Sequence, residues 1–490
     1  MIALDKAVEL FRAGRLEEAR RSCRKAVRER PDLPETHLLL AEIQRGLGEE
    51  ERAQESDARV LRLQPGWTRA HLASALGDLY ADFGRMPEAE ARYRSALGLD
   101  PDHAEARERL VRLLYQERRF EELERLCRDT MARFPRESLY PEKLGAALWF
   151  LGRHEEAVQA YGMAMDRAAS PEAMQDAGLN KALSLLALGR YAEGWDSFRW
   201  RHPRARLRAA HPQIVDDPAA LASLAKPAHI RIHAEQGLGD ELFFLRFADA
   251  LRRSGHWLSA TGDPRLAALL PAFFDAGAGA ADFSLCSGDL PSASGQVFAP
   301  PLALSVDGAR SEHFRGLLEK FGPPPYIGVT WRAGVLPDEP KPQRGAFLMK
   351  EVPPERLAQA IAPSDVRVVI LQRRPDAEDL RRFAAGLGRA ALDLSRVNVD
   401  LRDALAALAL LDDYVGVSNT NMHLRAGLPG RPARVLVSMP PEWRWGLHGS
   451  TSEWFPAFTV YRRRFGDDWT QVLSKLGQDL RERYAAPQHR

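Results

Sequence analysis

The sequence predicts an α-helical repeat region followed by an α/β region that contains parallel β-sheets. Two observations support this prediction. A pattern of glycine, small residues and proline recurs through about the first 200 residues, and the apolar period changes from helical to strand-like near residue 229. Because the chain has 490 residues, which is too long for one ordinary domain, we expect two or three domains.

The bulk composition excludes several classes of protein. The chain is 45% hydrophobic and 28% charged, and its net charge of +2 gives no reason to expect a nucleic-acid partner. Cys23, Cys127 and Cys286 lie too far apart in sequence for a zinc motif or a disulfide framework. The N-terminus lacks the apolar core of a signal peptide, and no stretch approaches ~20 uncharged apolar residues. We therefore expect a cytoplasmic protein with no membrane span.

The repeat in the first part of the chain has a fixed register. Ala19 is followed by Ala26 and Pro31, and the same spacing returns about 34 residues later from Ala53. The register continues at Ala89, Leu123, Ala157 and Gly194, which gives six anchors with Ala19 and Ala53. The residues five positions before these six anchors are Gly14, Gly48, Gly84, Arg118, Gly152 and Gly189. Glycine permits a turn between two helices, the small residue lets them approach closely, and proline ends the unit.

This pattern resembles the tetratricopeptide repeat (TPR), with about six helix–turn–helix units over residues 1–200. Such units stack into a helical solenoid, and the concave face of the solenoid usually binds a protein segment. We therefore expect a protein partner on that face and no catalytic chemistry from the repeats. Residues 201–228 are predicted to be a connector with one short helix. The cations expected on its solvated face are Arg204, Arg206 and Arg208.

The α/β region is predicted from apolar strands that alternate with helical segments. The strands are "HIRIHA", "HWLSAT", "YIGVTW", "DVRVVILQ", "YVGVS" and "ARVLVSM". Such alternation implies parallel sheets that are covered by helices on both faces. The elements fall into two groups, 229–322 and 323–490, which suggests two Rossmann-like halves with a cleft between them. We expect the final helix, at about 468–484, to return to the first half.

The loop "QGLGD" follows the first strand of this region, where ligands bind in open parallel sheets. It is neither a complete dinucleotide fingerprint, because Leu242 replaces the third glycine, nor a phosphate loop. Two interpretations stay open. Asp240 is a first-turn acid that satisfies the helix dipole. Alternatively, Gln236, Gly237 and Gly239 form an acceptor loop that a substrate approaches, and Asp240 takes a proton from its hydroxyl.

The loop "SNTNMH" also follows a strand and begins a helix, which makes it a candidate anion site for a diphosphate. Its candidate residues are Ser418, Asn419, Thr420, Asn421 and His423. Ordinary helix capping is the alternative for Ser418 and Asn419, and His423 either faces the phosphates or packs under the sheet. Weaker candidates for donor contacts are Arg332, Lys341, Arg344 and Gln372. We expect "EWRW", residues 442–445, to pack or to line the cleft.

No metal site is expected in the α/β region, because no DxD motif stands at the end of a predicted strand. The Asp-Asp pairs at 216–217, 412–413 and 467–468 are assigned to linkers or the surface. In the absence of a metal, the helix dipole and cationic side chains must stabilise the charge of a leaving diphosphate.

The order of four segments resembles the C-terminal domain of bacterial tetratricopeptide-repeat glycosyltransferases, over about residues 190–485. The segments are "QGLGDELFFLRFADAL", "IGVTWRAG", "VGVSNTNMHLRAGLPGRPARVLV" and "PEWRW". These enzymes are related to ADP-heptosyltransferases and share their GT-B fold, and the layout is also similar to O-GlcNAc transferase. The resemblance implies an acceptor side at 229–322, a donor side at 323–490 and Asp240 as the base. The family motif D-T-x-x-x-H-L-A matches at Thr420, His423 and Leu424, whereas Ser418-Asn419 lie where its Asp is expected.

The function expected from the sequence is therefore that of a metal-independent glycosyltransferase. It would move a sugar from a nucleotide-sugar donor, which is a substrate and not a cofactor, to a hydroxyl on a protein presented by the repeats, such as a surface or flagellar subunit. Two alternatives stay open. The chain is a scaffold with an inactive transferase domain, as Ser418-Asn419 suggest, or it acts on a glycan or lipid-linked acceptor and the repeats serve for assembly.

Overall fold

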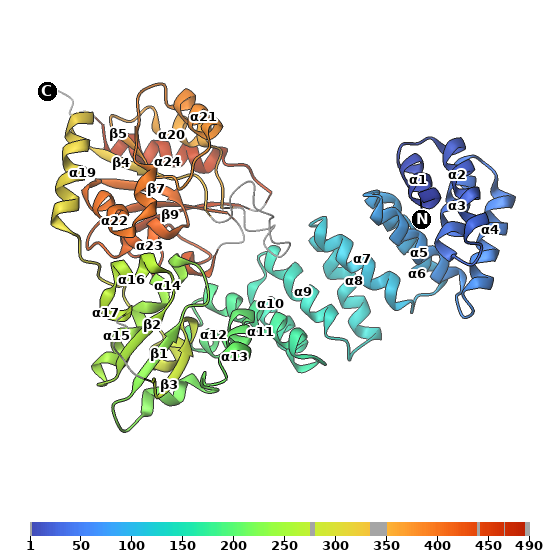
Figure 1. The fold of residues 1–490 in the computed structure, drawn as a ribbon, viewed down its shortest axis with the longest axis horizontal. Coiled ribbons are helices and arrows are strands. Elements are labelled where there is room, and N and C mark those ends of the chain that lie inside the picture. The colour runs from blue at the N-terminus through green and yellow to red at the C-terminus, as the bar shows by residue number, and fades with distance from the viewer. Residues whose placement is uncertain (1, 275–279, 334–349, 439–441, 465, 486–490) are drawn as a thin grey trace. The chain divides into compact units, whose positions relative to one another are not determined.

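The structure is a computed structural model that describes residues 2–274, 280–333, 350–438, 442–464 and 466–485 (Figure 1). The chain divides into two compact units, Met1–Arg133 and Phe134–Arg490. The first unit is helical, and the second contains further helices and both β-sheets. Parallel sheets after residue 229 were predicted, and every pairing between the strands named below is parallel.

The first unit consists of helices that follow one another in hairpin-like pairs. They are α1 (Ile2–Arg12), α2 (Leu16–Glu29), α3 (Pro34–Gly46), α4 (Glu50–Leu63), α5 (Arg69–Asp82), α6 (Met86–Leu99), α7 (Ala104–Gln116) and α8 (Phe120–Arg133). The anchors Ala19, Ala53, Ala89 and Leu123 are fully buried. This burial agrees with their predicted role, which is to let paired helices approach closely.

The turn positions of the repeat adopt one backbone conformation. Gly14, Gly48 and Gly84 have φ values of 73°, 76° and 72°, and Gly152 and Gly189 both have 78°. These values lie in the left-handed region, which glycine reaches without steric cost. Arg118 occupies the same position in its repeat with a φ of 59°. The prediction that glycine recurs because the chain turns there is confirmed, and the one departure keeps the same turn.

The second unit begins with further helices, and those up to residue 198 continue the repeat pattern. They are α9 (Leu139–Phe150), α10 (His154–Asp166), α11 (Pro171–Ala187), α12 (Tyr191–Phe198) and α13 (His202–Ala210), followed by the short helix η1 (Pro218–Ser223). Trp195 and Phe198 of α12 belong to the same hydrophobic core as the first strands of the α/β region. The last repeat helices are therefore part of the unit that holds the sheets.

The basic cluster in the connector differs from the prediction. Arg204 is buried, and its Nε lies 3.0 Å from Oδ1 of Asp289. The prediction of a solvated face was wrong for this residue, because Asp289 comes from a distant part of the sequence and supplies the countercharge that allows burial.

The first sheet has three strands in the order β2-β1-β3. The strands are β1 (His229–His233), β2 (Trp257–Thr261) and β3 (Phe283–Cys286), and its helices are α14 (Leu238–Phe244), η2 (Leu245–Phe247), α15 (Ala248–Arg253), α16 (Pro264–Leu269), α17 (Pro271–Phe274), η3 (Ser287–Asp289) and α18 (Leu290–Ser294). The helix predicted after "QGLGD" is interrupted by η2. Cys286 at the end of β3 is a buried thiol, as are Cys23 and Cys127.

The second sheet has six strands in the order β6-β5-β4-β7-β8-β9. The strands are β4 (Tyr326–Val329), β5 (Arg367–Ile370), β6 (Leu392–Asp393), β7 (Asp413–Val417), β8 (Ala433–Ser438) and β9 (Phe458–Arg463). Numbered within this sheet, the order is 3-2-1-4-5-6, which is that of a doubly wound fold. The order reverses between β4 and β7, so a crevice is expected at the carboxyl ends of these two strands.

Helices cover both faces of the second sheet. One face carries α20 (Pro354–Ile361), α21 (Ala377–Leu387) and α24 (Thr470–Arg483), and the other carries α19 (Gly308–Phe321), α22 (Leu401–Leu410) and α23 (Thr420–Ala426). The strand residues alternate between the two cores: Ile327 and Val329 belong to one, and Tyr326 to the other. This double burial explains the continuous apolar runs in the sequence.

Two further predictions about the second half were wrong. The final helix α24 packs on α20 and does not return to the first half, and Leu473, Leu476 and Leu480 share a core with Ile361. Asp413 is fully buried and does not lie at the surface, because Arg434 donates from Nε to its carboxylate at 2.8 Å.

Candidate functional site

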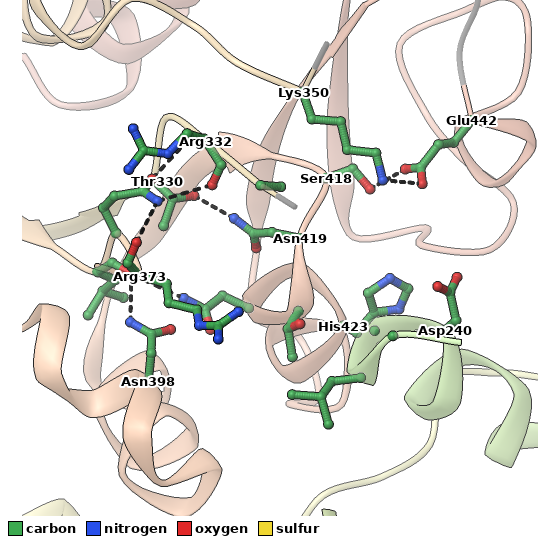
Figure 2. A pocket seen from close by; sticks show the side chains of 18 of the residues that line it. Asp240, Thr330, Arg332, Lys350, Arg373, Asn398, Ser418, Asn419, His423 and Glu442 are labelled. Atoms are coloured by element: carbon green, nitrogen blue, oxygen red, sulfur yellow. Dashed lines mark hydrogen bonds and ion pairs between the residues drawn. The ribbon is translucent and has the colours of Figure 1, made fainter. Parts of the chain in front are cut away.

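A pocket of about 220 Å³ lies at the carboxyl ends of β4, β5 and β7, where the strand order reverses (Figure 2). The start of α14 in the first half and the start of α23 in the second half also border it. Its lining residues are Gly237, Leu238, Gly239, Asp240, Thr330, Arg332, Ala333, Lys350, Leu371, Gln372, Arg373, Asn398, Ser418, Asn419, Thr420, Asn421, His423, Glu442 and Arg444. The two loops singled out in the sequence therefore meet at one pocket.

Most of the residues selected from the sequence line this pocket. Those it brings together are Asp240, Gly237, Gly239, Arg332, Gln372, Ser418, Asn419, Thr420, Asn421 and His423. Gln236 does not line it. Lys341 and Arg344 lie outside the described residues. Glu442 and Arg444 of "EWRW" line the pocket, as expected for residues 442–445. The polar residues that sequence reasoning missed are Thr330, Lys350, Arg373 and Asn398. Their sequence positions carry no common motif, so the tertiary fold was needed to assemble them.

The two glycines of "QGLGD" have different roles. A Cβ atom on Gly239 would lie 2.9 Å from Cδ2 of His423, closer than real Cβ contacts. A Cβ on Gly237 would meet only Oδ2 of Asp240, at 3.8 Å, and its φ of −78° is open to any residue. Gly239 is therefore required by the close approach of His423 from the second half, whereas Gly237 leaves space at the pocket wall.

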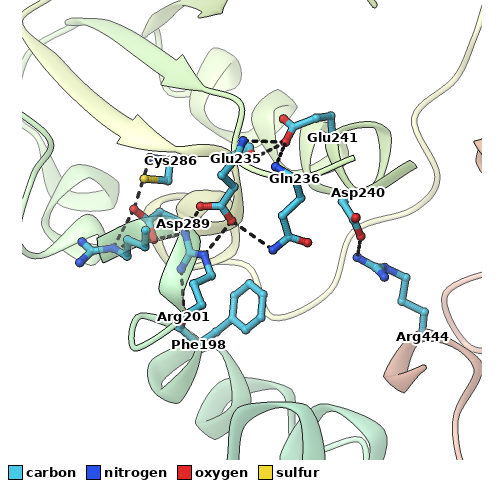
Figure 3. Close-up of polar contacts among 11 residues, drawn as sticks. Phe198, Arg201, Glu235, Gln236, Asp240, Glu241, Cys286, Asp289 and Arg444 are labelled. Carbon is cyan, nitrogen blue, oxygen red and sulfur yellow. Dashed lines mark hydrogen bonds and ion pairs between the residues drawn. The ribbon is translucent and has the colours of Figure 1, made fainter. Parts of the chain in front are cut away.

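The carboxylate of Glu241 fixes the backbone that precedes the glycines (Figure 3). Its Oε1 accepts hydrogen bonds from the backbone N–H of Glu235 at 3.0 Å and of Gln236 at 3.2 Å, and from Oγ of Ser287 at 2.9 Å. Burial raises the pKa of Glu241 to about 7. The different roles of Glu241 and its neighbour Asp240 could not be predicted from the sequence, because only the fold turns one inward and the other toward the pocket.

A buried ionic network ties this loop to the helices that precede it (Figure 3). Arg201, which is 1% exposed, donates from Nε to Glu235 at 2.7 Å and from a terminal nitrogen to Asp289 at 2.7 Å. Arg204 contacts the same Asp289 carboxylate. The backbone of the loop is thus held from both sides, by Glu241 and by Arg201.

Asp240 reaches across the pocket to Arg444. One terminal nitrogen of the Arg444 guanidinium donates to Oδ1 of Asp240. The side chain of Asp240 is 29% exposed, whereas that of Arg444 is 6% exposed. The guanidinium lies over the rings of Trp443 and Phe243, at 4.5 and 4.7 Å from their centroids. A carboxylate from the first half and a cation from the second are therefore paired inside the pocket.

The start of α23 is capped by Asn419. Its Oδ1 accepts from the backbone N–H of Met422 at 3.2 Å, and its Nδ2 donates to Oγ1 of Thr330 at 2.8 Å (Figure 2). Ser418 donates its hydroxyl to the carboxylate of Glu442. Asn419 therefore caps the helix, as one of the two interpretations predicted, and its side chain also lines the pocket.

Three ion pairs arrange the charges around the pocket. Besides the Asp240–Arg444 pair, Arg332 contacts Asp379 at 2.6 Å and Lys350 contacts Glu442 at 2.5 Å. Although burial opposes ionisation, Lys350 and Arg444 lower the pKa of Glu442 to about 2. The cationic side chains of the described pocket wall are Arg332, Lys350, Arg373 and Arg444, against the two carboxylates of Asp240 and Glu442. With Asp379 included, three carboxylates face these four cations, so a small excess of positive charge remains, which suits an anionic ligand.

His423 is a buried neutral side chain at the pocket. Burial, reinforced by the charges of Arg444 and Arg246, holds its pKa well below the usual value. Its Nδ1 is buried and has no hydrogen-bond partner among the described residues. A neutral imidazole offers a ligand either a hydrogen-bond donor or an acceptor.

No cluster of three or more His, Cys, Asp or Glu side chains suited to a metal ion occurs among the residues that the structure describes. Within the described ranges, no helix combines the length and apolar character that crossing a membrane requires.

Comparison with known families identifies the class of the N-terminal segment. Residues 10–77 and 80–140 match the family described as the tetratricopeptide repeat. The helices of this segment are tetratricopeptide repeats, and such repeats imply peptide or protein partners.

Individual proteins match only part of this chain, at identities of 22% to 36%. Protein FlbA of Caulobacter vibrioides is 27% identical over 365 residues, and the match covers 68% of this chain and 59% of FlbA. The chain is 36% identical over 97 residues to UDP-N-acetylglucosamine–N-acetylmuramyl-(pentapeptide) pyrophosphoryl-undecaprenol N-acetylglucosamine transferase of a Methylobacterium species, covering 20% of this chain and 26% of that enzyme. The crystal structure of PilW, a widely conserved type IV pilus biogenesis factor, has a TM-score of 0.26 and 22% identity, and the match covers 43% of this chain and 93% of PilW. The chain thus spans less than two thirds of either sequence relative.

Proposed function

We propose that the chain is a glycosyltransferase of the GT-B type, with the acceptor at 229–322 and a nucleotide-sugar donor at 323–490. The observation that carries this proposal is the pocket itself. Asp240 enters it from the loop after β1, and the cations at the ends of the second sheet enter it from the opposite half. A carboxylate that faces a cation-rich wall across a crevice provides both parts of the reaction, a base for the acceptor and charge stabilisation for the leaving group.

The donor assignment is supported by the size and charge of the pocket. Its volume of about 220 Å³ is below the ~300–1,000 Å³ of sites that enclose a whole drug-sized ligand. This volume suits the diphosphate and the reacting end of a sugar. Arg332 and Lys350 would offset the diphosphate charge without a metal ion. The proposed polar contacts to the donor come from Gln372, Ser418, Asn419, Thr420, Asn421 and His423.

In the proposed reaction Asp240 is the catalytic base. Its carboxylate takes the proton of the acceptor hydroxyl as the acceptor oxygen attacks the anomeric carbon of the sugar. The bond between that carbon and the diphosphate oxygen breaks, and its electron pair leaves with the nucleoside diphosphate. Gly237 and Gly239 would let the acceptor approach the backbone beside this carboxylate.

The departure of "SNTNMH" from the family motif does not remove the acid from the pocket. Glu442 comes from a different segment, and its carboxylate accepts the hydroxyl hydrogen bond of Ser418. A carboxylate therefore lies next to the position where the resembling family carries its Asp. This observation favours an active site over a degenerate one, and the short match to an N-acetylglucosamine transferase points the same way.

We further propose that the acceptor is a protein held by the tetratricopeptide repeats. The repeats imply a peptide or protein partner, and the loop that carries Asp240 is tied to α12 and α13 through Arg201. A glycan or lipid-linked acceptor, with the repeats serving for assembly, is the alternative for the same chemistry.

A scaffold without transfer activity is the second candidate function, and the repeats favour it because scaffolds use such repeats for binding. The discriminating experiment incubates the full chain with a panel of nucleotide sugars and measures the release of nucleoside diphosphate. A transferase releases it from at least one donor, whereas a scaffold releases none. A pull-down with the full chain, analysed for proteins that become glycosylated, then separates a protein acceptor from a glycan acceptor.

A further inference from the structure

The ion pair between Asp240 and Arg444 joins the two halves of the second unit across the pocket (Figure 3). Sequence reasoning assigned a role to Asp240 and none to Arg444 beyond packing or lining the cleft. Yet Arg444 is the cation that contacts the proposed base, and it lines the pocket beside it.

The surroundings of Arg444 hold its backbone and leave bonding capacity on its guanidinium. Its carbonyl oxygen accepts from Oγ of Ser452 at 2.6 Å, which fixes the chain at this point. Its Nε is buried and has no hydrogen-bond partner in the described part of the chain. A second carboxylate, that of Glu442, lies 3.8 Å from a terminal nitrogen. A buried guanidinium with an unfilled donor is costly unless a further acceptor completes it.

The three ion pairs of the pocket differ in how readily they can be broken. The carboxylate side chains of Asp379 and Glu442 are 9% and 16% exposed, whereas that of Asp240 is 29% exposed. An acid that loses its cation is left with an unpaired charge. This costs the least free energy for the most exposed acid, because water can solvate it. Asp240 is therefore the partner that an incoming anion displaces most easily, and Arg444 is the cation it gains.

We propose that Arg444 is an exchangeable anion-binding residue, which pairs with Asp240 in the free protein and with the diphosphate when a ligand is bound. The inference rests on the proposed function, because it deepens the donor site named there. When the diphosphate takes Arg444, the carboxylate of Asp240 loses its cationic partner and faces the acceptor. The same exchange places a guanidinium on the leaving group, so one residue links donor binding to the release of the base.

If Asp240 and the ligand compete for Arg444, substitutions of these two residues should not act independently. A double-mutant cycle measures this coupling. The probe is inorganic pyrophosphate, and its binding to the full chain is measured by calorimetry. Asp240→Asn should tighten binding by about threefold to tenfold, since the competing carboxylate is lost. Arg444→Gln should weaken binding by about tenfold. In the Arg444→Gln background, Asp240→Asn should change the affinity by less than about twofold.

Asp249→Asn is the matched control, because it makes the same charge change on the exposed side of α15 away from the pocket. It should leave pyrophosphate binding unchanged. Equal tightening by Asp240→Asn in both backgrounds would overturn the proposal, because simple repulsion between Asp240 and the anion would then explain it. No tightening by Asp240→Asn would overturn it too.

If Arg444→Gln does not fold, Arg444→Lys serves in its place. The lysine keeps the charge and loses the planar fork, so pyrophosphate binding should weaken severalfold. Unchanged affinity would count against a direct contact. The outcomes also separate this inference from the proposed function. If the two substitutions are coupled but no nucleotide sugar is turned over, the transferase proposal is refuted and the exchange at Arg444 is not. If a nucleotide sugar is turned over but the substitutions are not coupled, only the exchange at Arg444 is refuted.

Discussion

Replacement of Gly239 by alanine tests whether the two halves meet as the structure has them. In an isolated helix, Gly→Ala would stabilise α14 by about 1 kcal/mol. Here the new Cβ would lie 2.9 Å from Cδ2 and 3.2 Å from Nε2 of His423. His423 has little room to yield, because Phe455 packs against its ring with centroids 5.4 Å apart. Overpacking of this kind costs about 1–3 kcal/mol, so the contact reverses the sign of the helix effect.

The expected result is a net loss of stability on the order of 1 kcal/mol for Gly239→Ala. Gly237→Ala is the matched control, because its Cβ meets only Oδ2 of Asp240 at 3.8 Å. At that N-cap position, the entropic gain and the poorer cap offset each other to within about 0.5 kcal/mol. The assay is thermal unfolding of both variants, followed by tryptophan fluorescence. A Gly239→Ala protein that melts above the wild type would refute the contact with His423.

Two further variants test the buried acids of the second unit. Burial raises the pKa of Glu241 to about 7, so the neutral carboxyl stabilises the fold fully below about pH 4.5. This contribution to stability, on the order of 3 kcal/mol, is lost as the pH rises to about 7. Glu241→Gln should therefore be more stable than the wild type at pH 8 and lose this advantage by pH 4.5 in melting experiments; a constant difference across this range would contradict the role of burial. Asp413→Asn removes the charge that pairs with Arg434 at 2.8 Å and should cost roughly 3–5 kcal/mol, whereas the exposed control Asp467→Asn should change stability by less than about 0.5 kcal/mol. Equal stabilities of the last two proteins, measured by denaturant titration, would show that the buried pair is not needed.

The repeats and the main strands could be predicted because their signals are local. A left-handed turn favours glycine, and a strand buried on both faces favours an unbroken apolar run, so both leave a mark on a few consecutive residues. Three strands were missed, and they lack such a mark. β3, Phe283–Cys286, is interrupted by Ser284, β6 is only Leu392–Asp393, and β9, Phe458–Arg463, ends in arginines. Their place in the sheet is set by neighbours that are distant in sequence.

The candidate site was predictable only in part, for the same reason. Ser418 follows β7 directly, and Asp240 lies in the first turn of the helix that follows β1, so the topology of an open sheet predicts their meeting. Arg444 and Glu442 were expected only to pack or to line the cleft, and their pairings with Asp240 and Ser418 are set by the tertiary fold. Arg204 and Asp413 were misplaced at the surface because each is buried by one distant partner of opposite charge.

The proposed role of Asp240 as the base of a transferase is tested by transfer in the Asp240→Asn variant. The measurement is the rate of nucleoside diphosphate release from the donor that the wild type uses best, with acceptor present. Loss of a general base should lower this rate by about 10²–10⁴. Pyrophosphate affinity should not fall. The melting temperature is measured as a control for folding, because the substitution removes the carboxylate that pairs with the buried Arg444. An unchanged rate in a folded Asp240→Asn protein would contradict the account and leave Asp240 as a first-turn acid paired with Arg444.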